Sequence, residues 1–412
     1  MITSPILATP GRDALDVAAV GRGGSLFAGD LAAARPQIAA ALTGARVLAI
    51  GGGGSIGSAT VRLLSGFRPR ALHVIDLSEN YLAELVRDLR GRPEGLAVED
   101  FRTLPLDYGS PLMRAFLQAA EPYDVVLNFA ALKHVRSEKD VFSLLQMIDT
   151  NVVRQARLKS WLLEYRHPCS YFAVSTDKAA NPTSLMGASK RLMEDVTFDL
   201  HVAPGQRTTS ARFANVAFSN GSLLAAFLER LQRRQPLAAP RDTARYFVTQ
   251  AESAEICLIA ALAIPDGMVL IPRLDPAEAL QDLGALAGRV LRAHGLRAVP
   301  YEDEAAARHD VEGCAARGEW PLLLTPLDTS GEKPYEEFVG ASETAEELGF
   351  EALLALRHQP GSVLLRESLQ AFERMVSETD ASLTKQDVVD VIARAVPHLA
   401  HVETGRNLDQ RL

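Results

Sequence analysis

The sequence predicts a doubly wound α/β fold, in which helices cover both faces of a parallel sheet, with a smaller C-terminal domain and a helical C-terminal tail. The first observation is a series of short runs that are apolar throughout, as expected of strands buried on both faces. The second is that helix-length segments, such as 79–90 and 112–120, separate these runs and indicate right-handed βαβ units. The runs are 47–50, 72–75, 125–128, 171–174 and 268–271.

The composition is that of a folded globular chain without a broad basic surface. The 412 residues are 47% hydrophobic and 23% charged, and 43 Lys and Arg against 51 Asp and Glu give a net charge of −8. Nucleic acid is therefore not an expected partner, because binding it requires a cationic surface. Cys169, Cys257 and Cys314 are odd in number and widely spaced, so we expect a reducing compartment, no disulfide framework and no metal site.

No segment has the length or composition expected of a membrane span or a secretory leader. Residues 1–10 lack a basic start followed by a sustained apolar stretch. The longest apolar run, 256–264, ends after nine residues, about half of what a bilayer-spanning helix needs. We therefore expect a cytoplasmic protein without a membrane span.

A glycine-rich turn directly follows the first predicted strand and opens a helix. The glycines are spaced as G-x-x-G-x-x-G, which lets the backbone approach a pyrophosphate while the helix N-terminus offers free N–H groups. Such a turn alone is also compatible with a tight connection and nothing more, but its place between strand and helix is what dinucleotide binding requires. The predicted contacts from this turn are Gly51, Gly54, Ser55, Ile56 and Gly57.

The second predicted strand ends at an acid that suits the ribose of the same dinucleotide. Asp76 lies nineteen residues beyond Gly57, where a carboxylate can accept both ribose hydroxyls and would repel a 2′-phosphate. This favours NAD, with NADP as the alternative. Asp76 is also compatible with a helix N-cap, with Ser78 close by. Asp107 and Tyr108 fit either an adenine contact or a simple turn.

A reactive cluster is predicted at the carboxyl end of the strand 171–174. Thr176, Asp177 and Lys178 follow that strand, at the edge where open parallel sheets bind ligands. Met186 and Lys190 lie one turn apart on the helix that comes next, and Lys190 is placed to reach the nicotinamide ribose. The alternative for Asp177 and Lys178 is a surface ion pair on a loop.

These segments, taken in order, resemble extended short-chain dehydrogenase/reductases with a Rossmann fold. They are most similar to the polysaccharide-biosynthesis (CapD-like) branch, the UDP-N-acetylglucosamine 4,6-dehydratases, over about residues 20–350. The pair Ser-Thr-Asp-Lys and Met-Gly-Ala-Ser-Lys is the most specific part of the likeness. The segments that carry the resemblance are 51–57, 130–135, 175–179, 181–182, 186–190, 212–216, 245–247 and 331–333.

The resemblance implies a lyase reaction on a nucleotide sugar with a tightly bound, recycled cofactor. A 4,6-dehydratase oxidises the C4 hydroxyl, removes the C5 proton, expels the C6 hydroxyl as water and returns the hydride to C6. By resemblance, Lys178 is the base and Asp177 the acid, as a neutral amine beside a protonated carboxyl can serve both roles. Thr176 would hydrogen-bond near the C4 oxygen, and Lys190 would orient the ribose. The same likeness places Ala130 and Ala131 against the cofactor.

Met186 departs from the wider superfamily, which has a tyrosine that deprotonates the hydroxyl being oxidised. A thioether cannot transfer a proton. Several dehydratases of the branch carry methionine at this position, so Met186 supports the subfamily and is counted with the catalytic cluster. The base for the C4 hydroxyl is left open between Asp177, Lys178 and a water.

The substrate end is predicted from the same resemblance. Asn215 and Ser222 match the segment that holds the sugar diphosphate, and Lys133 and His134 are expected to line the sugar pocket. A structural role for His134 is the alternative. Arg245 either supplies charge to the diphosphate or lies on the surface.

Two arginines of the family are replaced in this chain. Asn220 stands at one of these positions, and Thr329-Ser330 replaces the Arg-Pro pair before the motif 331–333. Each change removes a guanidinium that would clamp phosphate. UDP-N-acetylglucosamine is the first choice of substrate and another NDP-hexose the second.

Two other functions compete with a dehydratase, and both keep the same fold. A sugar 4-epimerase needs only C4 oxidation and reduction, generally with a tyrosine base, which Met186 and the Asp177-Lys178 pair argue against. A non-catalytic nucleotide-binding homologue fits the departures at Arg136, Asn220 and Ser330.

The expected organisation has four parts and a homo-oligomer. Extended members commonly pair through two long helices, here expected at 142–165 and 190–201. The helical stretch 31–42 is expected beside the sheet or at a subunit contact. The four parts are an N-terminal extension (1–45), the dinucleotide-binding domain (46–214), a mainly substrate-binding domain (215–350) and the helical tail (351–412).

Overall fold

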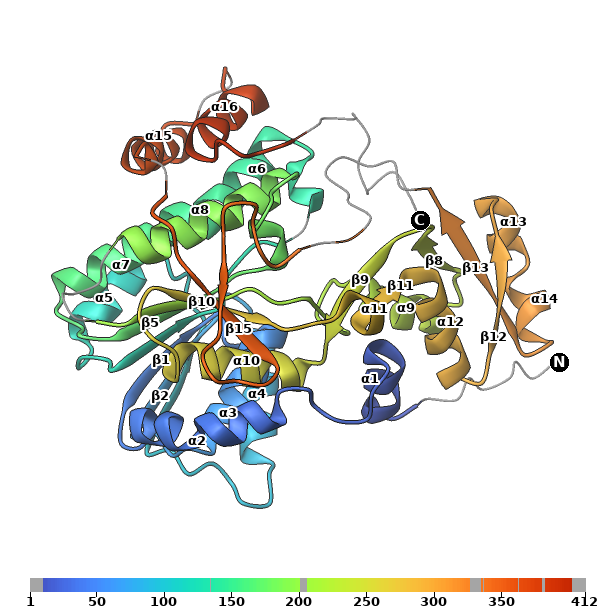
Figure 1. The fold of residues 1–412 in the computed structure, drawn as a ribbon, viewed down its shortest axis with the longest axis horizontal. Helices are drawn as coiled ribbons and strands as arrows, with labels where there is room; N and C mark the ends of the chain where they lie inside the picture. The colour runs from blue at the N-terminus through green and yellow to red at the C-terminus, as the bar shows by residue number, and fades with distance from the viewer. Residues whose placement is uncertain are drawn as a thin grey trace.

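The main unit of the structure is a nine-stranded sheet whose strands run parallel from β3 to β10, while near one edge β15 runs antiparallel to both of its neighbours, β10 and β14 (Figure 1). The computed structural model describes residues 10–133, 135–200, 206–326, 335, 337–361, 363–379 and 382–401. All five predicted runs are strands of this sheet. In sheet order the strands are β14 Ala345–Glu346, β15 Leu353–Arg357, β10 Met268–Pro272, β6 Thr208–Ala211, β5 Ser170–Val174, β4 Val125–Asn128, β1 Arg46–Ile50, β2 Ala71–Ile75 and β3 Asp100–Leu104.

Helices cover both faces of this sheet, as the doubly wound prediction requires. The side chains of each central strand alternate between two cores, so that Val47 of β1 joins one and Leu48 the other. The first core lies under α2, α3, α4 and α10, and the second under α5, α7 and α8 (Figure 1). These helices are α2 Ala28–Leu42, α3 Ser55–Ser65, α4 Glu79–Arg90, α5 Pro111–Ala119, α7 Arg154–Glu164, α8 Leu185–Asp199 and α10 Gln250–Leu262.

The N-terminal residues divide between the two parts of the molecule. The predicted helix 31–42 is α2, and its fully buried Ile38 and Leu42 pack against the sheet core, which confirms the first of its two expected placements. The shorter α1 (Arg12–Val20) instead packs with the smaller domain, where Leu15 and Val20 are buried.

The smaller domain combines two three-stranded sheets with helices (Figure 1). Its core forms around the fully buried side chains of Phe227, Leu286 and Trp320. The sheets have the orders β11-β9-β7 and β12-β13-β8. The elements are β7 Asn215–Val216, α9 Leu223–Gln232, β8 Leu237–Pro240, β9 Ala244–Val248, α11 Pro276–Ala279, β11 Leu280–Asp282, α12 Leu283–Ala293, β12 Arg297–Tyr301, α13 Glu304–His309, α14 Val311–Ala315 and β13 Glu319–Thr325.

The C-terminal segment begins as part of the main sheet and ends as two helices. Strand β15 lies inside the range 351–412, and α15 (Leu365–Ser377) and α16 (Lys385–Ala395) follow it. These helices share an apolar cluster with α8 and α6 (Val141–Ile148), which a π-helical turn, Asp149–Val153, joins to α7. Part of the helix surface expected to pair with a second copy is therefore covered by the chain itself, and the homo-oligomer stays a prediction.

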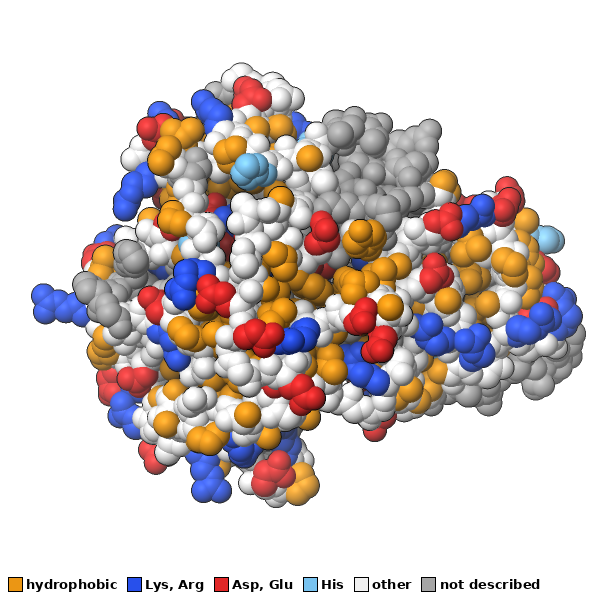
Figure 2. Space-filling view, in the orientation of Figure 1, with side chains coloured by type: hydrophobic (Ala, Val, Ile, Leu, Met, Phe, Trp, Pro, Cys, Tyr) orange, Lys and Arg blue, Asp and Glu red, His pale blue; other side chains and the backbone are white. Residues whose placement is uncertain are grey.

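The surface carries charges of both signs. On the face shown in Figure 2, acidic and basic side chains are interspersed between apolar ones rather than gathered into one field. Within the described ranges, no helix combines the length and apolar character needed to cross a bilayer.

Removing one aromatic side chain from the C-terminal apolar cluster should destabilise the protein. Phe372 of α15 is fully buried, so Phe372→Ala should lower the free energy of unfolding by about 3–5 kcal/mol. Urea unfolding measures the change. The matched control is Phe142→Ala on α6, because Phe142 is 65% exposed and its removal should leave the stability close to wild type. Equal effects of the two substitutions would contradict the placement of α15.

Candidate active site

The glycine-rich turn is built by backbone contacts that exclude side chains. Gly51 has a φ of +70°, and a Cβ there would lie 2.6 Å from the backbone nitrogen of Ala130. A Cβ on Gly57 would lie 2.3 Å from the carbonyl oxygen of Gly51. Helix α3 then begins after Gly54, which offers no side chain to the first-turn N–H groups. The turn thus presents an uncapped helix N-terminus at the edge of the sheet.

Asp76 is held directly beside this turn. Its carboxylate accepts hydrogen bonds from the N–H of Gly53 at 3.0 Å and from the N–H of Ser78 at 2.9 Å. The N-cap of α4 is Ser78, whose hydroxyl accepts from the N–H of Tyr81 at 3.3 Å. Asp76 is therefore not the cap, and its place beside the turn fits a contact to ribose.

Asp107 and Tyr108 are engaged within the protein. The hydroxyl of Tyr108 donates to the carbonyl oxygen of Thr150, and burial raises the pKa of this phenol well above its usual value. The carboxylate of Asp107 forms a 2.6 Å ion pair with Arg154. These contacts favour a turn over an adenine contact for both residues.

The loop after β4 lies against the glycine turn. The N–H of Ala130 donates to the side chain of Asn128 at 3.1 Å, which fixes Ala130 at the closest approach to Gly51. Ala131 follows and is half-buried. Both alanines thus lie at the same edge of the sheet as the uncapped helix, and their contact with a cofactor stays a prediction.

The predicted acid and amine meet directly at the end of β5. The hydroxyl of Thr176 donates to Oδ1 of Asp177 at 2.6 Å, and Nζ of Lys178 donates to the same oxygen at 3.1 Å. The side chain of Asp177 is 2% exposed, and within the described residues its Oδ2 has no hydrogen-bond partner. The pair is therefore not an ion pair on an open surface loop.

Lys190 reaches the same strand end from α8. Its ammonium donates to the carbonyl oxygen of Val174 at 2.8 Å and lies 3.0 Å from the sulfur of Met193. Burial lowers the pKa of Lys190 to about 8, and Glu194 opposes this change. Val174 precedes Thr176 by two residues, so the ammonium of Lys190 lies close to the end of β5, at the edge where a ribose would lie.

Met186 has a packing role in this structure. Its side chain is 3% exposed and belongs to the apolar cluster shared with α15 and α16. Its N–H donates at 2.8 Å to Oε1 of Glu138, a residue that the sequence analysis missed. Burial raises the pKa of Glu138. No local pattern marks Glu138, because its partner lies 48 residues further along the chain.

The segments expected at the substrate end are brought together at the glycine turn. The ammonium of Lys133 donates to the hydroxyl of Ser219 at 3.2 Å, and the N–H of Asn220 donates to the hydroxyl of Ser55 at 2.9 Å. Two distant segments, one after β4 and one after β7, therefore meet over the start of α3. This is the place where a diphosphate bound at the turn would extend toward the sugar.

The remaining predicted substrate residues have partners of their own. The amide of Asn215 donates to the carbonyl oxygen of Tyr246 at 3.3 Å, and the hydroxyl of Ser222 caps α9. Arg245 donates to the carbonyl oxygen of Ala244 at 2.8 Å. His134 and the segment 327–334, which contains Ser330 and the motif 331–333, lie outside the described residues.

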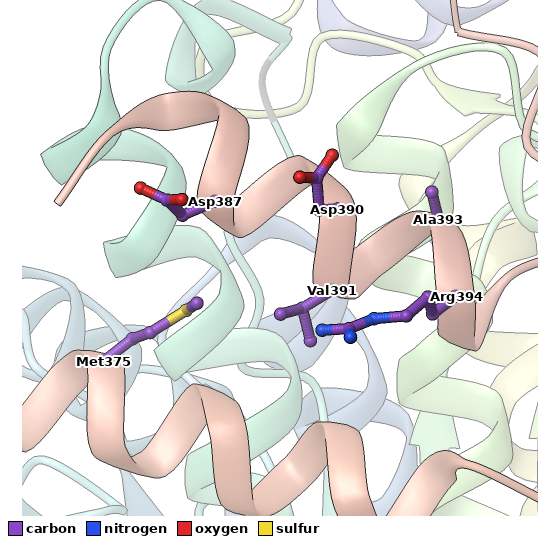
Figure 3. A pocket seen from close by; sticks show the side chains of 6 residues that line it. All are labelled: Met375, Asp387, Asp390, Val391, Ala393 and Arg394. Atoms are coloured by element: carbon purple, nitrogen blue, oxygen red, sulfur yellow. The ribbon is translucent and has the colours of Figure 1, made fainter.

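Two other features bear on ligands. Within the part of the chain that the structure describes, no group of three or more His, Cys, Asp or Glu side chains is arranged to hold a metal ion. A cavity of about 580 Å³ opens between α15 and α16, away from the strand ends (Figure 3). Its lining residues are Met375, Asp387, Asp390, Val391, Ala393 and Arg394.

A comparison with protein families identifies the chain. Residues 47–357, from the first strand through β15, match the family model described as polysaccharide biosynthesis protein. The chain belongs to this family. The resemblance to the polysaccharide-biosynthesis branch of extended short-chain dehydrogenase/reductases is thereby confirmed.

Individual relatives match much of the chain. A membrane protein of Methanocaldococcus jannaschii, MJ1061, is 30% identical over 58% of this chain and 68% of its own length. The probable polysaccharide biosynthesis protein EpsC of Bacillus subtilis is 26% identical over 76% of this chain and 56% of its own. The capsular polysaccharide biosynthesis protein CapD of Staphylococcus aureus is 27% identical over 59% of this chain and 40% of its own length. The match thus spans about half the length of EpsC and CapD.

Solved structures confirm the fold. Pen from Bacillus thuringiensis aligns with a TM-score of 0.61 and 20% identity, over 77% of this chain and 91% of that one. A UDP-N-acetylglucosamine 4-epimerase from Methanobrevibacter ruminantium aligns with a TM-score of 0.52 and 14% identity, over 82% of this chain and 100% of that one. At this identity the likeness establishes the shared architecture.

Gly57 and Gly54 of the glycine turn differ in how much room they leave for a side chain. Gly57→Ala should lower the free energy of unfolding by about 1–3 kcal/mol, because its Cβ would overlap the backbone of Gly51 and Gly52. Gly54→Ala is the control, since the nearest atom to its Cβ would be 3.5 Å away. Thermal and urea unfolding of the protein without added cofactor measure both. A Gly57→Ala variant as stable as wild type would contradict the close approach.

Proposed function

We propose that this protein is a nucleotide-sugar 4,6-dehydratase that uses NAD and converts UDP-N-acetylglucosamine to a UDP-4-keto-6-deoxy-N-acetylhexosamine. The observation that carries the proposal is the contact of an acid and an amine at the end of β5, where Asp177 and Lys178 share one hydrogen bond at 3.1 Å. Membership of the polysaccharide biosynthesis protein family supports a nucleotide sugar as the substrate.

The residues around the glycine turn fit a dinucleotide. The backbone contacts at Gly51 and Gly57 form a cradle without side chains, and the first turn of α3 has no side-chain cap. Asp76 beside the turn suits a ribose with two free hydroxyls, which favours NAD over NADP. When bound, the nicotinamide supplies a hydride acceptor that is regenerated within each turnover. Lys190 of α8, whose ammonium lies at the end of β5, would hold the nicotinamide ribose.

Asp177 and Lys178 would carry out the elimination. Transfer of one proton across their 3.1 Å contact gives a neutral amine and a carboxylic acid without changing the net charge of the pair. The amine of Lys178 then takes the C5 proton of the 4-keto sugar. The electrons of the broken C–H bond form the C5–C6 double bond as the C6–O bond breaks, and Asp177 protonates the departing oxygen to give water.

Oxidation at C4 requires a separate proton acceptor. Met186 cannot serve, because a thioether has no exchangeable proton and its side chain packs in the apolar cluster. Thr176 lies 2.6 Å from Oδ1 of Asp177 and would direct its hydroxyl toward the C4 oxygen. The proton of the C4 hydroxyl then passes to Asp177, Lys178 or a bound water.

Mass spectrometry of UDP-N-acetylglucosamine incubated with the protein in deuterated water, without added cofactor, tests this function. We expect loss of one water and gain of deuterium at C5. Lys178→Ala should keep its bound nicotinamide but lose both changes, with a rate lowered by about 100-fold or more. The matched control is Lys139→Ala, because Lys139 is exposed and lies outside the cluster.

The outcomes separate the alternatives. Normal product formation by Lys178→Ala would remove that residue from the mechanism. An unchanged sugar mass, with C4 found inverted by nuclear magnetic resonance of the same product, would overturn the dehydratase in favour of an epimerase. An unchanged sugar, with nicotinamide present in the protein, would direct the next trial to another NDP-hexose.

A further inference from the structure

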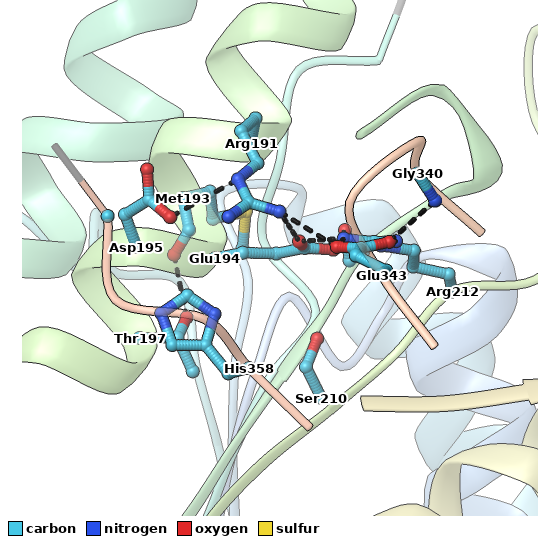
Figure 4. A network of polar contacts seen from close by, with 12 residues as sticks. Arg191, Met193, Glu194, Asp195, Thr197, Ser210, Arg212, Gly340, Glu343 and His358 are labelled. Atoms are coloured by element: carbon cyan, nitrogen blue, oxygen red, sulfur yellow. Dashed lines mark hydrogen bonds and ion pairs between the residues drawn. The ribbon is translucent and has the colours of Figure 1, made fainter. Parts of the chain in front are cut away.

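Three segments that are separate in the sequence meet at one buried arginine (Figure 4). Arg212 follows β6, and its side chain is 1% exposed. Two of its nitrogens donate to the two oxygens of Glu194 on α8, at 2.7 and 2.6 Å. On its other side the guanidinium donates to both oxygens of Glu343, at 2.5 and 2.8 Å. Arg212 thus bridges two carboxylates, each of them bound through two hydrogen bonds.

The first carboxylate, that of Glu194, also binds the end of β5. The hydroxyl of Ser175 donates to Oε1 of Glu194 at 2.5 Å, and both groups are buried. Ser175 directly precedes Thr176, and Glu194 lies one helical turn after Lys190. Glu194 therefore fixes the end of β5 relative to the helix that carries Lys190.

The second carboxylate holds the segment 337–343, through which the chain returns from the smaller domain to β14 of the main sheet. The N–H of Gly340 donates to Glu343 at 2.7 Å, and Arg212 donates to the carbonyl oxygen of Phe338 at 3.0 Å. Arg191 of α8 adds an ion pair with Glu343 at 3.0 Å. The segment is thus fastened to α8 and β6 by charge as well as by backbone contacts.

The same segment lies on the loop that carries the acid and the amine. The side chain of Asn181 accepts from the N–H of Ala341 at 3.1 Å and donates to Glu337 at 3.0 Å. A Cβ on Gly340 would lie 2.8 Å from the carbonyl oxygen of Ala180, which shows how closely the two backbones approach. The segment 337–343 therefore contacts the loop after Lys178 directly, and it is linked to the end of β5 through Arg212 and Glu194.

The electrostatics of this junction keep both carboxylates ionised. Burial alone would raise the pKa of Glu194, but the adjacent Arg212 outweighs it and lowers the pKa to about 2. Burial also acts to raise the pKa of Glu343, and the same guanidinium brings it below its usual value. Both carboxylates stay ionised at neutral pH, so neutralising either leaves a buried guanidinium with one partner fewer.

We propose that Arg212 and Glu343 are positioning residues that couple the returning segment 337–343 to the end of β5, so that the placement of Thr176, Asp177 and Lys178 depends on how the smaller domain rejoins the main sheet. The chain through Ser175, Glu194, Arg212 and Glu343 is the physical connection. Its effect on turnover rests on the proposed function, whereas the coupling itself does not.

Hydrogen–deuterium exchange of the full protein without substrate tests the coupling directly. Glu343→Gln keeps the shape of the side chain and removes its charge. We expect exchange at least about tenfold faster in peptides covering both 337–343 and 175–181. Glu347→Gln is the matched control, because Glu347 lies on the same returning stretch, is 69% exposed and pairs with Arg273. Faster exchange in 337–343 with 175–181 unchanged would overturn the proposal.

A second, milder variant keeps the test open if Glu343→Gln folds poorly. Ser175→Ala removes only the hydroxyl that links Glu194 to the catalytic strand. We expect kcat on the sugar nucleotide to fall about tenfold, with KM within about twofold and the nicotinamide content unchanged. If Glu343→Gln does fold, the double variant Ser175→Ala with Glu343→Gln should lose less kcat than the product of the two single losses.

The outcomes distinguish this proposal from the proposed function. Strictly multiplicative losses in the double variant would show two independent sites and overturn the coupling. If the wild-type protein does not convert the sugar nucleotide, the proposed function fails, and the exchange experiment still decides the coupling.

Discussion

The parallel register of β1, β4 and β5 is the constraint on which the rest of the structure depends. Ile50 pairs with Asn128, and Asn128 pairs with Ala173, so the three strands end at one level. The glycine turn, the loop of Ala130 and Ala131 and the cluster that begins at Thr176 therefore emerge side by side. Only glycine fits where the turn meets Ala130, because a Cβ on Gly51 would lie 2.6 Å from its nitrogen. The glycine turn and the Asp177–Lys178 pair share one edge for this reason, as the proposed function requires.

An apolar cluster stabilises one side of that edge, and buried ion pairs stabilise the other. On one side, α15 and α16 place an apolar cluster around Met186, where an ionisable side chain would have to be desolvated. On the other, Arg212 gathers two carboxylates and ties the returning segment to α8. In the proposed function the proton chemistry falls to Asp177 and Lys178, the acid and the amine that share a hydrogen bond at the strand end.

The sequence predicted the elements that are buried because their own side chains are apolar. The five apolar runs and the helix Glu79–Arg90 are all present. Strand β6 was not recognised, because Thr208–Ala211 is polar and is buried only through partners such as the carbonyl oxygen of Ala173, which accepts from Ser210. Glu138 and Glu343 were missed for a related reason: each acts on a partner far away in the chain, and no local spacing marks such a pair. The segment motifs did predict which residues meet at the strand ends, because topology brings those ends together.

The most direct test of the account is the fate of a deuterium atom placed at C4 of UDP-N-acetylglucosamine, followed by nuclear magnetic resonance of the product formed by the protein as purified. A dehydratase that holds its cofactor throughout the cycle must move this atom within one sugar. The account predicts deuterium at C6 of a product that has lost one water. Deuterium found at C4 of a sugar of unchanged composition and inverted C4 configuration would contradict it, because the reaction would then stop at oxidation and reduction of C4.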